Sequence, residues 1–393
     1  MSNGKAEKKV LVEGQEPIDE APKDETKEQA NEANMIGDVA RTGTYRKAIL
    51  GNAAVAFAGK TVLDVGAGSG ILSYMSAQAG ANQVIALEAS SMAEKIEIMV
   101  KAANSGRTNP HLKDRIRIVR GMVENKKVQE QVLQTGKVDT IVSEPIGVML
   151  LHERMVESFI LARDLFLKPG GQLLPSAGHI FFCPFSDEGL YNETDQKAQF
   201  FNNTLFGTDF SELYDAAREE VFAQPVVGMF PPTSLISTPC PPKSFDFYTC
   251  SNDDLLEFTI PIDFTVSRTS LVHGLASWFD LDFQPRPAPA EEDEQPLNPG
   301  PTPPPPADGL TVTLSTGPNV NKGERLTGSI HFKVNDARSY DLFLDLQVNR
   351  PGPEWDPNPL KRMAKYALQQ QCFNYSYNPD ANMGTLGFNG LPA

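Results

Sequence analysis

The feature that most constrains the fold is a strand that runs directly into a glycine-rich turn. Residues 61–65, TVLDV, form an apolar run that ends at Gly66, and Gly68 and Gly70 follow at every second position. The pattern of residues 69–80 then predicts a helix. A strand, a glycine turn and a helix in this order are typical of the first unit of a parallel sheet.

The alternation of strands and helices continues to about residue 175. Apolar runs predict strands at 83–88, 115–119 and 138–143, and apolar faces predict helices at 91–104 and 155–167. Alternating units of this kind indicate an α/β domain, a doubly wound parallel sheet with helices on both faces, over residues 34–175.

After about residue 175 the sequence pattern changes from alternating strands and helices to mostly strands. Strand-like segments such as LEFTIPIDFTV and HGLASWFDLDF dominate residues 176–350, and helical patterns are confined to about 188–223. This part of the chain predicts a second, mainly antiparallel domain. The proline-rich stretch 284–309 predicts a surface loop. We expect it to be a spacer, which is favoured over the alternative of a docking site for a domain that binds proline-rich peptides. Residues 1–33 and 351–393 have the composition of disordered segments.

The charge and the cysteines exclude several function classes. The net charge is −15, so the chain lacks the basic surface of a nucleic-acid-binding protein. The acidity either attracts basic partners or serves only to keep the protein soluble. No apolar run is long enough for a transmembrane helix or a signal peptide, which predicts a location in the nucleus and cytoplasm. The four cysteines include no closely spaced pair, so we expect reduced thiols and no metal site.

The glycine turn predicts a nucleoside ligand. Gly66, Gly68 and Gly70 follow GxGxG spacing, which differs from that of dinucleotide-binding proteins, and no basic residue follows to meet a pyrophosphate. The second strand ends in Glu88, whose carboxylate can accept hydrogen bonds from the hydroxyls of a ribose. Glu124 follows the third strand and can accept from an adenine amino group. These residues together favour S-adenosyl-L-methionine as the cofactor.

Several segments resemble the type I protein arginine methyltransferases, most closely the coactivator-associated branch that acts on histone arginines. The resemblance rests on ARTGTYRKAIL (40–50), VLDVGAGSGILS, IALEASSMA, GMVE, SEPIGVMLLHERMVES (143–158) and LKPGGQLLP. It implies a methyltransferase domain followed by a β-barrel domain. Residues 185–227 resemble the helical arm through which the family forms homodimers.

The resemblance also implies roles for individual residues. Glu144 and Glu153 match the paired glutamates of the active site. Met35 and Met155 match the methionines that shape the acceptor pocket and favour asymmetric dimethylation. The positions that match cofactor contacts are Arg41, Gly66, Glu88, Glu124 and Ser158.

The chemistry of arginine supports a pair of carboxylates. A guanidinium is a poor nucleophile while its charge is delocalised, and its pKa is above about 12. Two carboxylates can clamp its donors and aim one terminal nitrogen at the methyl group. One of them can also accept the proton that is released. Glu144 follows the carboxyl end of a predicted strand, and parallel sheets of this type bind their ligands at that edge.

The sequence departs from the family in two segments. Residues 23–33 lack the aromatic residues of the helix that closes over the cofactor, and the Thr-His-Trp loop is absent after LSTGP (314–318). The main hypothesis is an enzyme that methylates arginines of histones and other basic nuclear proteins. Because of these departures a second hypothesis stays open, in which the protein is a catalytically weak, dimeric relative that binds basic protein tails. A small-molecule methyltransferase is a third, which the paired glutamates disfavour.

Overall fold

The computed structural model describes residues 36–285, 310–314, 318–349 and 361–374. The chain divides into two compact units, Met1–Tyr45 and Arg46–Ala393. The described part of the first unit includes the beginning of helix α2, which spans Val39–Gly51. No helix of the described segments has the length and apolar character needed to cross a membrane.

The first half of the larger unit is a five-stranded sheet in the order β3-β2-β1-β4-β5, and every strand pair in it is parallel. Its strands are β1 (Thr61–Val65), β2 (Gln83–Glu88), β3 (Ile116–Arg120), β4 (Val138–Ser143) and β5 (Leu167–Leu174). The helices that alternate with them are α3 (Ile71–Gln78), α4 (Met92–Asn104), α5 (Lys126–Leu133) and α6 (Met155–Phe166). The predicted doubly wound sheet is therefore confirmed.

Apolar side chains explain why these strands occupy the centre of the layer. Val62, Leu63, Ile85 and Ile141 are fully buried, as expected for strands that are covered on both faces. The order of the strands reverses at β1, because β2 pairs with one of its edges and β4 with the other. Ligands of such sheets bind at the carboxyl ends of the strands at this reversal.

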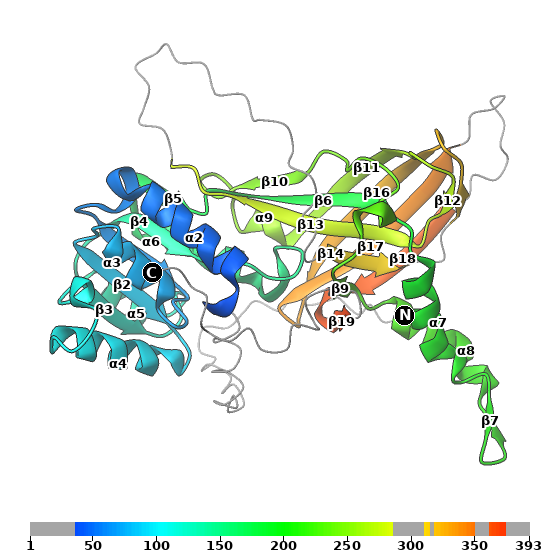
Figure 1. Ribbon diagram of the computed structural model, residues 1–393, viewed down its shortest axis with the longest axis horizontal. Coiled ribbons are helices and arrows are strands. Elements are labelled where there is room, and N and C mark those ends of the chain that lie inside the picture. Colours follow the sequence, from blue (N-terminus) through cyan, green and yellow to red (C-terminus); the bar gives the residue numbers. More distant parts are fainter. Residues whose placement is uncertain (1–35, 286–309, 315–317, 350–360, 375–393) are drawn as a thin grey trace, which may run out of the picture. The chain divides into compact units, whose positions relative to one another are not determined.

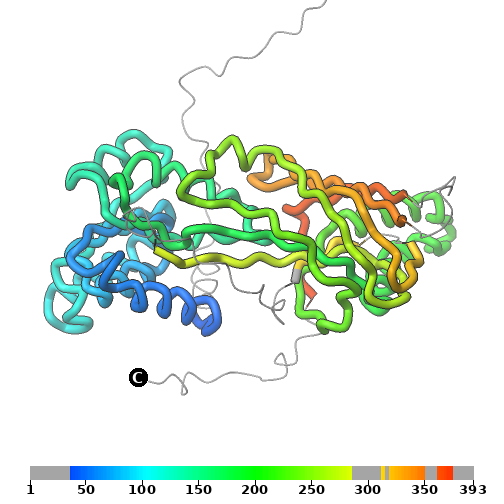
Figure 2. The backbone as a smooth tube through the Cα atoms, turned by 90° about the horizontal axis from the view of Figure 1, so that it is seen from above, coloured from blue at the N-terminus to red at the C-terminus, as the bar shows by residue number. Residues whose placement is uncertain are grey.

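The second half consists of two larger sheets, in the orders β10-β6-β13-β14-β9-β19 and β11-β16-β17-β18. Their strands are β6 (Ala177–Phe185), β9 (Val226–Gly228), β10 (Lys243–Asp246), β11 (Glu257–Thr265), β13 (Gly274–Asp282), β14 (Leu310–Leu314), β16 (Arg325–Asn335), β17 (Ser339–Asn349), β18 (Lys361–Ala367) and β19 (Cys372–Asn374). All pairs are antiparallel except β19 with β9. Figure 2 shows the long strands β6 and β13 side by side. The predicted antiparallel domain is confirmed.

A helical excursion leaves this domain after β6. It comprises α7 (Glu188–Gln199), a small hairpin of β7 (Thr204–Leu205) and β8 (Thr208–Asp209), and α8 (Tyr214–Phe222), and it projects beyond the strands in Figure 1. Arg218 joins the two helices, since its guanidinium donates to Asp195 at 2.8 Å and to the Tyr191 hydroxyl at 2.7 Å. The predicted helices near 188–223 are thus present.

The prediction of disorder from residue 351 onward is wrong for residues 361–374. Strand β18 pairs with β17 over seven residues, from Asp341↔Ala367 to Gln347↔Lys361, and β19 pairs with β9. Tyr366 and Leu368 are buried. The backbone groups on the free edge of β17 provide the reason, because a partner strand satisfies them whatever its composition. Residues 1–33, 286–309, 351–360 and 375–393 of the other predicted loops and tails lie outside the described residues.

Candidate functional site

The glycine turn and Glu88 form one hydrogen-bonded unit. The two carboxylate oxygens of Glu88 accept from the backbone N–H of Gly68 at 2.6 Å and of Ser90 at 2.7 Å, and the side chain is buried. These bonds fix the carboxylate at the end of β2 and leave further lone pairs on both oxygens. Gly70 has φ +82°, and a Cβ there would lie 2.8 Å from the Tyr74 ring. The turn therefore depends on glycine, and the arrangement fits a ligand that brings hydroxyl donors to Glu88.

The strand register brings Glu88 and Glu144 to the same edge of the sheet. Val65 is in register with Leu87 on one side and with Ser143 on the other. Glu88, the last residue of β2, and Glu144, the residue after β4, therefore both lie level with the start of the glycine turn. Neighbouring strands are about 4.8 Å apart, which separates the two Cα positions by roughly 10 Å. Ser143 reinforces the junction, because its hydroxyl donates to the Val65 carbonyl at 2.7 Å.

Glu124 and Ser158 also come together. The Ser158 hydroxyl, on α6, donates to the Glu124 carboxylate at 2.7 Å. The two residues are 34 positions apart in the chain and were predicted to serve the same ligand. Their cofactor role stays a prediction.

Met155 lies against the glycine turn. A Cβ placed on Gly66 would be 3.1 Å from the Met155 methyl group, so the predicted acceptor-pocket methionine lies directly beside the predicted cofactor loop. Arg41 belongs to the other compact unit, on α2, and its role as a cofactor contact stays a prediction. Met35 lies outside the described residues.

The segment from Glu144 to Glu153, called here the double-glutamate loop, has an unusual backbone. Two hydrogen bonds between Gly147 and Leu150 close its tip. Four of its residues or immediate neighbours have left-handed φ values without being glycine: Met149, Leu150, Glu153 and Arg154, with φ from 51° to 72°. Such conformations cost about 1–3 kcal/mol each and persist where surrounding contacts determine them.

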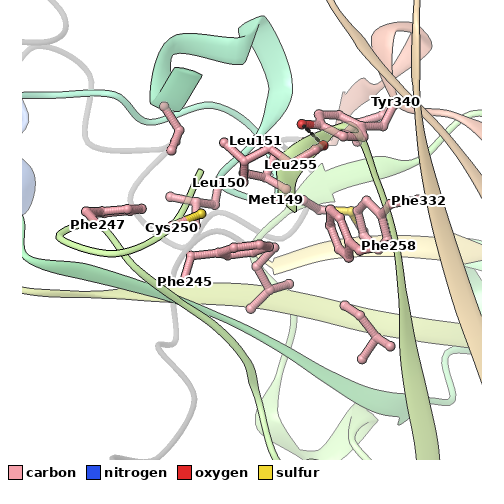
Figure 3. Close-up of a cluster of buried hydrophobic side chains, with 14 of the residues drawn as sticks. Met149, Leu150, Leu151, Phe245, Phe247, Cys250, Leu255, Phe258, Phe332 and Tyr340 are labelled. Atoms are coloured by element: carbon pink, nitrogen blue, oxygen red, sulfur yellow. Dashed lines mark hydrogen bonds between the residues drawn. The ribbon is translucent and has the colours of Figure 1, made fainter. Parts of the chain in front are cut away.

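The loop is anchored in the core of the antiparallel domain. Met149, Leu150 and Leu151 are almost completely buried. They belong to the same hydrophobic core cluster as aromatic side chains of the antiparallel domain. Figure 3 shows them among Phe245, Phe247, Phe258, Phe332 and Tyr340, with the Tyr340 hydroxyl donating to the Leu255 carbonyl. The position of the loop therefore depends on both halves of the larger unit.

The two glutamates differ in exposure. Glu144 is half-buried and Glu153 is exposed. Next to Glu153, Arg154 forms a two-pronged pair with Glu157, with distances of 2.6 and 2.7 Å, so this guanidinium is already neutralised by another partner. Glu153 thus lies two residues before the start of α6, beside an arginine that already has a carboxylate partner.

Sequence reasoning missed Asp64. It lies in the middle of β1, is fully buried, and accepts from the Ser73 hydroxyl at 2.7 Å. Burial raises the pKa of Asp64 to about 7, and the nearby Glu88 charge adds to this. The signal was available, because an acid inside an apolar strand run is rare unless it has a purpose.

Sequence reasoning also missed His152, within the double-glutamate loop, and the two residues that contact this loop, Arg338 and Ser339. His152 is hydrogen-bonded to the Ser339 hydroxyl at 2.8 Å, and the Arg338 guanidinium donates to the Glu153 carbonyl at 3.3 Å. Burial lowers the pKa of His152, while the Glu153 charge opposes this. No sequence pattern joins residues this far apart.

Family comparisons cover most of both halves. Residues 176–350 match the arginine methyltransferase oligomerization subdomain, and residues 49–174 match the ribosomal protein L11 methyltransferase family. The two matches meet where the parallel sheet gives way to the antiparallel sheets.

Individual relatives are also named as arginine methyltransferases. The chain is 40% identical over 323 residues to a probable histone-arginine methyltransferase CARM1 of Oryza sativa subsp. indica, covering 82% of this chain and 58% of the relative. It is 38% identical over 342 residues to the histone-arginine methyltransferase CARMER of Drosophila yakuba, covering 81% and 57%. The chain thus spans somewhat more than half the length of these curated relatives.

Solved structures share the architecture. Protein arginine methyltransferase 10 of Arabidopsis thaliana superposes with a TM-score of 0.68 at 26% identity, over 86% of this chain and 97% of that one. A Trypanosoma brucei PRMT1 enzyme–prozyme heterotetrameric complex with AdoHcy also has a TM-score of 0.68, at 27% identity, over 88% and 100%. With its glycine turn, its double-glutamate loop and its barrel, the chain belongs to the protein arginine methyltransferase family.

Proposed function

We propose that this protein transfers methyl groups from S-adenosyl-L-methionine to the guanidino nitrogens of protein arginines, with histones and other basic nuclear proteins as substrates. The observation that carries the proposal is the meeting of Glu88, the glycine turn and Glu144 at one sheet edge. The acidity of the chain, with a net charge of −15, favours basic substrate tails. A location in the nucleus and cytoplasm agrees with such substrates.

The chain's own residues bind and orient the two substrates. Glu88 accepts from the ribose hydroxyls, Gly66, Gly68 and Gly70 let the ligand approach the backbone, and Arg41, Glu124 and Ser158 supply the remaining cofactor contacts. The bound cofactor supplies an electrophilic methyl group on a positively charged sulfur.

Glu144 and Glu153 clamp the substrate guanidinium and direct one terminal nitrogen. The nitrogen lone pair forms the new bond to carbon while the sulfur–carbon electron pair returns to sulfur. The proton lost from that nitrogen passes to one of the carboxylates and then to water. Positioning supplies most of the acceleration.

Asymmetric dimethylation is the finer part of the proposal. Met155 lies against Gly66 and so can narrow the acceptor site next to the methyl donor, and Met35 is assigned to the same pocket. Two methyl groups on one nitrogen are then the expected end product. Mainly symmetric dimethylarginine in the product would contradict this type I assignment.

A homodimer is the proposed assembly. The arm from α7 to α8 exposes Phe200, Phe206 and Leu213, with Phe206 fully exposed. Apolar side chains gathered on a projecting element favour burial against a second copy.

Two variants test the site with opposite expected effects. The full chain, a mixed histone preparation and labelled S-adenosyl-L-methionine are incubated, modified arginines are identified by mass spectrometry, and S-adenosylhomocysteine binding is measured by calorimetry. Glu144→Gln should abolish methylation and leave binding nearly unchanged, because it replaces a charged acceptor by an amide. Glu88→Ala should weaken binding at least about tenfold, since a charged hydrogen bond contributes roughly 1.5–3 kcal/mol.

Two outcomes would contradict the assignment. A wild-type chain that binds S-adenosylhomocysteine without methylating any arginine would favour the alternative, a dimeric binding protein for basic tails. Unchanged binding in Glu88→Ala would remove the ribose role of this residue.

A further inference from the structure

The turn between β16 and β17 lies against the double-glutamate loop. It comprises residues 336–339, from the residue after the end of β16 at Asn335 to Ser339, the first residue of β17. Its residues and those of the loop are 185 to 187 positions apart in the chain. The contact therefore exists only through the tertiary fold.

The turn is held rigidly by Asn335. The side-chain oxygen of Asn335 accepts from the backbone N–H of Ala337 at 3.1 Å and of Ser339 at 3.2 Å. Its amide nitrogen donates to Asp341 and to Gln369, at 3.0 and 2.9 Å. The turn is thus tied to β17 and to the segment after β18, and its residues keep a fixed position.

Two groups of this turn reach the loop at adjacent residues. The fully buried Ser339 is hydrogen-bonded to His152 at 2.8 Å, and Arg338 donates to the backbone carbonyl of Glu153 at 3.3 Å. Glu153 has φ 72°, a conformation that a non-glycine residue keeps only when its surroundings impose it. The two contacts fall on this residue and on the one before it.

We infer that Arg338 and Ser339 are positioning residues that hold the Glu153 backbone in its left-handed conformation and so aim its carboxylate at the substrate guanidinium. The inference rests on the proposed function for its catalytic part. Met149, Leu150 and Leu151 anchor the tip of the loop in the core, whereas Glu153 is exposed and relies on the turn. The turn thus provides a brace for the exposed end of the double-glutamate loop.

The test compares variants of the turn with matched controls on the same hairpin. Ser339→Ala and Arg338→Ala remove the contacts, and His152→Leu removes the other side of the first one. Ser329→Ala and Arg325→Ala are the controls, because both residues lie on β16 away from the turn and Arg325 pairs with Asp263 instead. Arg338 and Arg325 are both exposed, so neither replacement opens the core.

Steady-state methylation of a histone peptide is the first measurement. Ser339→Ala and Arg338→Ala should lower kcat on the order of tenfold to a hundredfold, the cost of a small misplacement of a reacting group. The affinity for S-adenosylhomocysteine and the KM for the peptide should change less than about twofold, since ground-state contacts remain. His152→Asn, whose amide can still reach Ser339, should recover much of the kcat that His152→Leu loses.

Amide hydrogen exchange of residues 148–155 is the second measurement, and it does not depend on activity. The His152 and Arg154 amides donate within the loop, each at 3.1 Å, and should exchange about tenfold faster in Ser339→Ala than in Ser329→Ala. If the wild type methylates nothing, the proposed function fails and the exchange rates still decide the role of the turn. Equal kcat and equal exchange in the turn variants and their controls would overturn the inference.

Discussion

Asp64 is the residue whose chemistry departs most from its ordinary behaviour. It is fully enclosed in β1, with Ser73 as its hydrogen-bond donor and the Glu88 carboxylate nearby. Burial disfavours its charged form, which raises the pKa of Asp64 to about 7. Near neutral pH this acid, directly behind the glycine turn, therefore exists partly protonated.

Replacing Asp64 by Asn should change how stability depends on pH. The folded protein keeps a proton on Asp64 up to pH of about 7, whereas the unfolded chain releases it near pH 4. The wild type therefore loses stability as the pH rises from about 4 to about 7, and a neutral amide removes this loss. Calorimetric unfolding without ligand should show similar stabilities at pH 4 and an advantage for Asp64→Asn of roughly 1–3 kcal/mol at pH 8. Parallel curves for the two proteins would refute the raised pKa.

The double-glutamate loop is the element that joins the two halves of the larger unit. The hydrogen bond of Ser143 on β4 fixes the start of the loop. Three of its own side chains, buried in the core of the antiparallel domain, fix its tip, and contacts with the β16–β17 turn fix its end. Gly147 makes the tip possible, because a Cβ there would lie 1.9 Å from the His152 carbonyl oxygen. A sequence pattern identified the two glutamates, and the packing of this loop decides where they point.

Gly147→Ala should therefore disable catalysis without unfolding the protein. The backbone of residues 147–152 must shift to admit the methyl group, which displaces the carboxylates and should lower kcat on the order of a hundredfold. S-adenosylhomocysteine binding, measured by calorimetry, should stay within a few-fold of the wild type. Gly51→Ala is the control, because a Cβ at Gly51 meets nothing within 4 Å. Equal activity of the two variants would show that the loop tolerates the change.

The projecting arm is the feature of the larger unit that matters for the assembled molecule. Arg218 holds α8 against α7 through Asp195 and Tyr191 and lies over the Phe222 ring at 4.7 Å. The arm thus has its own internal order, while Phe206 at the hairpin between its helices is fully exposed. Burial of such a side chain against a second copy would stabilise the dimer.

Phe206→Asp should weaken the homodimer. Burying a phenylalanine contributes about 1.5–3 kcal/mol, and the variant loses this from both copies, so the dissociation constant should rise roughly a hundredfold or more. Light scattering across a dilution series should show twice the monomer mass for the wild type at concentrations where the variant is largely monomeric. Met363→Asp, at an exposed methionine on β18, should behave like the wild type. A monomeric wild type at micromolar concentration would remove the arm from the assembly.

The sequence alone determined the parallel sheet, the antiparallel domain and the edge where Glu88 and Glu144 meet. These follow from local patterns, since strand ends in a parallel sheet share one edge. The tertiary structure decided the rest. Strands β18 and β19 formed because distant strand edges needed partners, and the pKa of Asp64 depends on everything packed around it. The contacts of Arg338 and Ser339 with the double-glutamate loop join residues 185 to 187 positions apart, and only the folding of one half against the other brings them within hydrogen-bond distance.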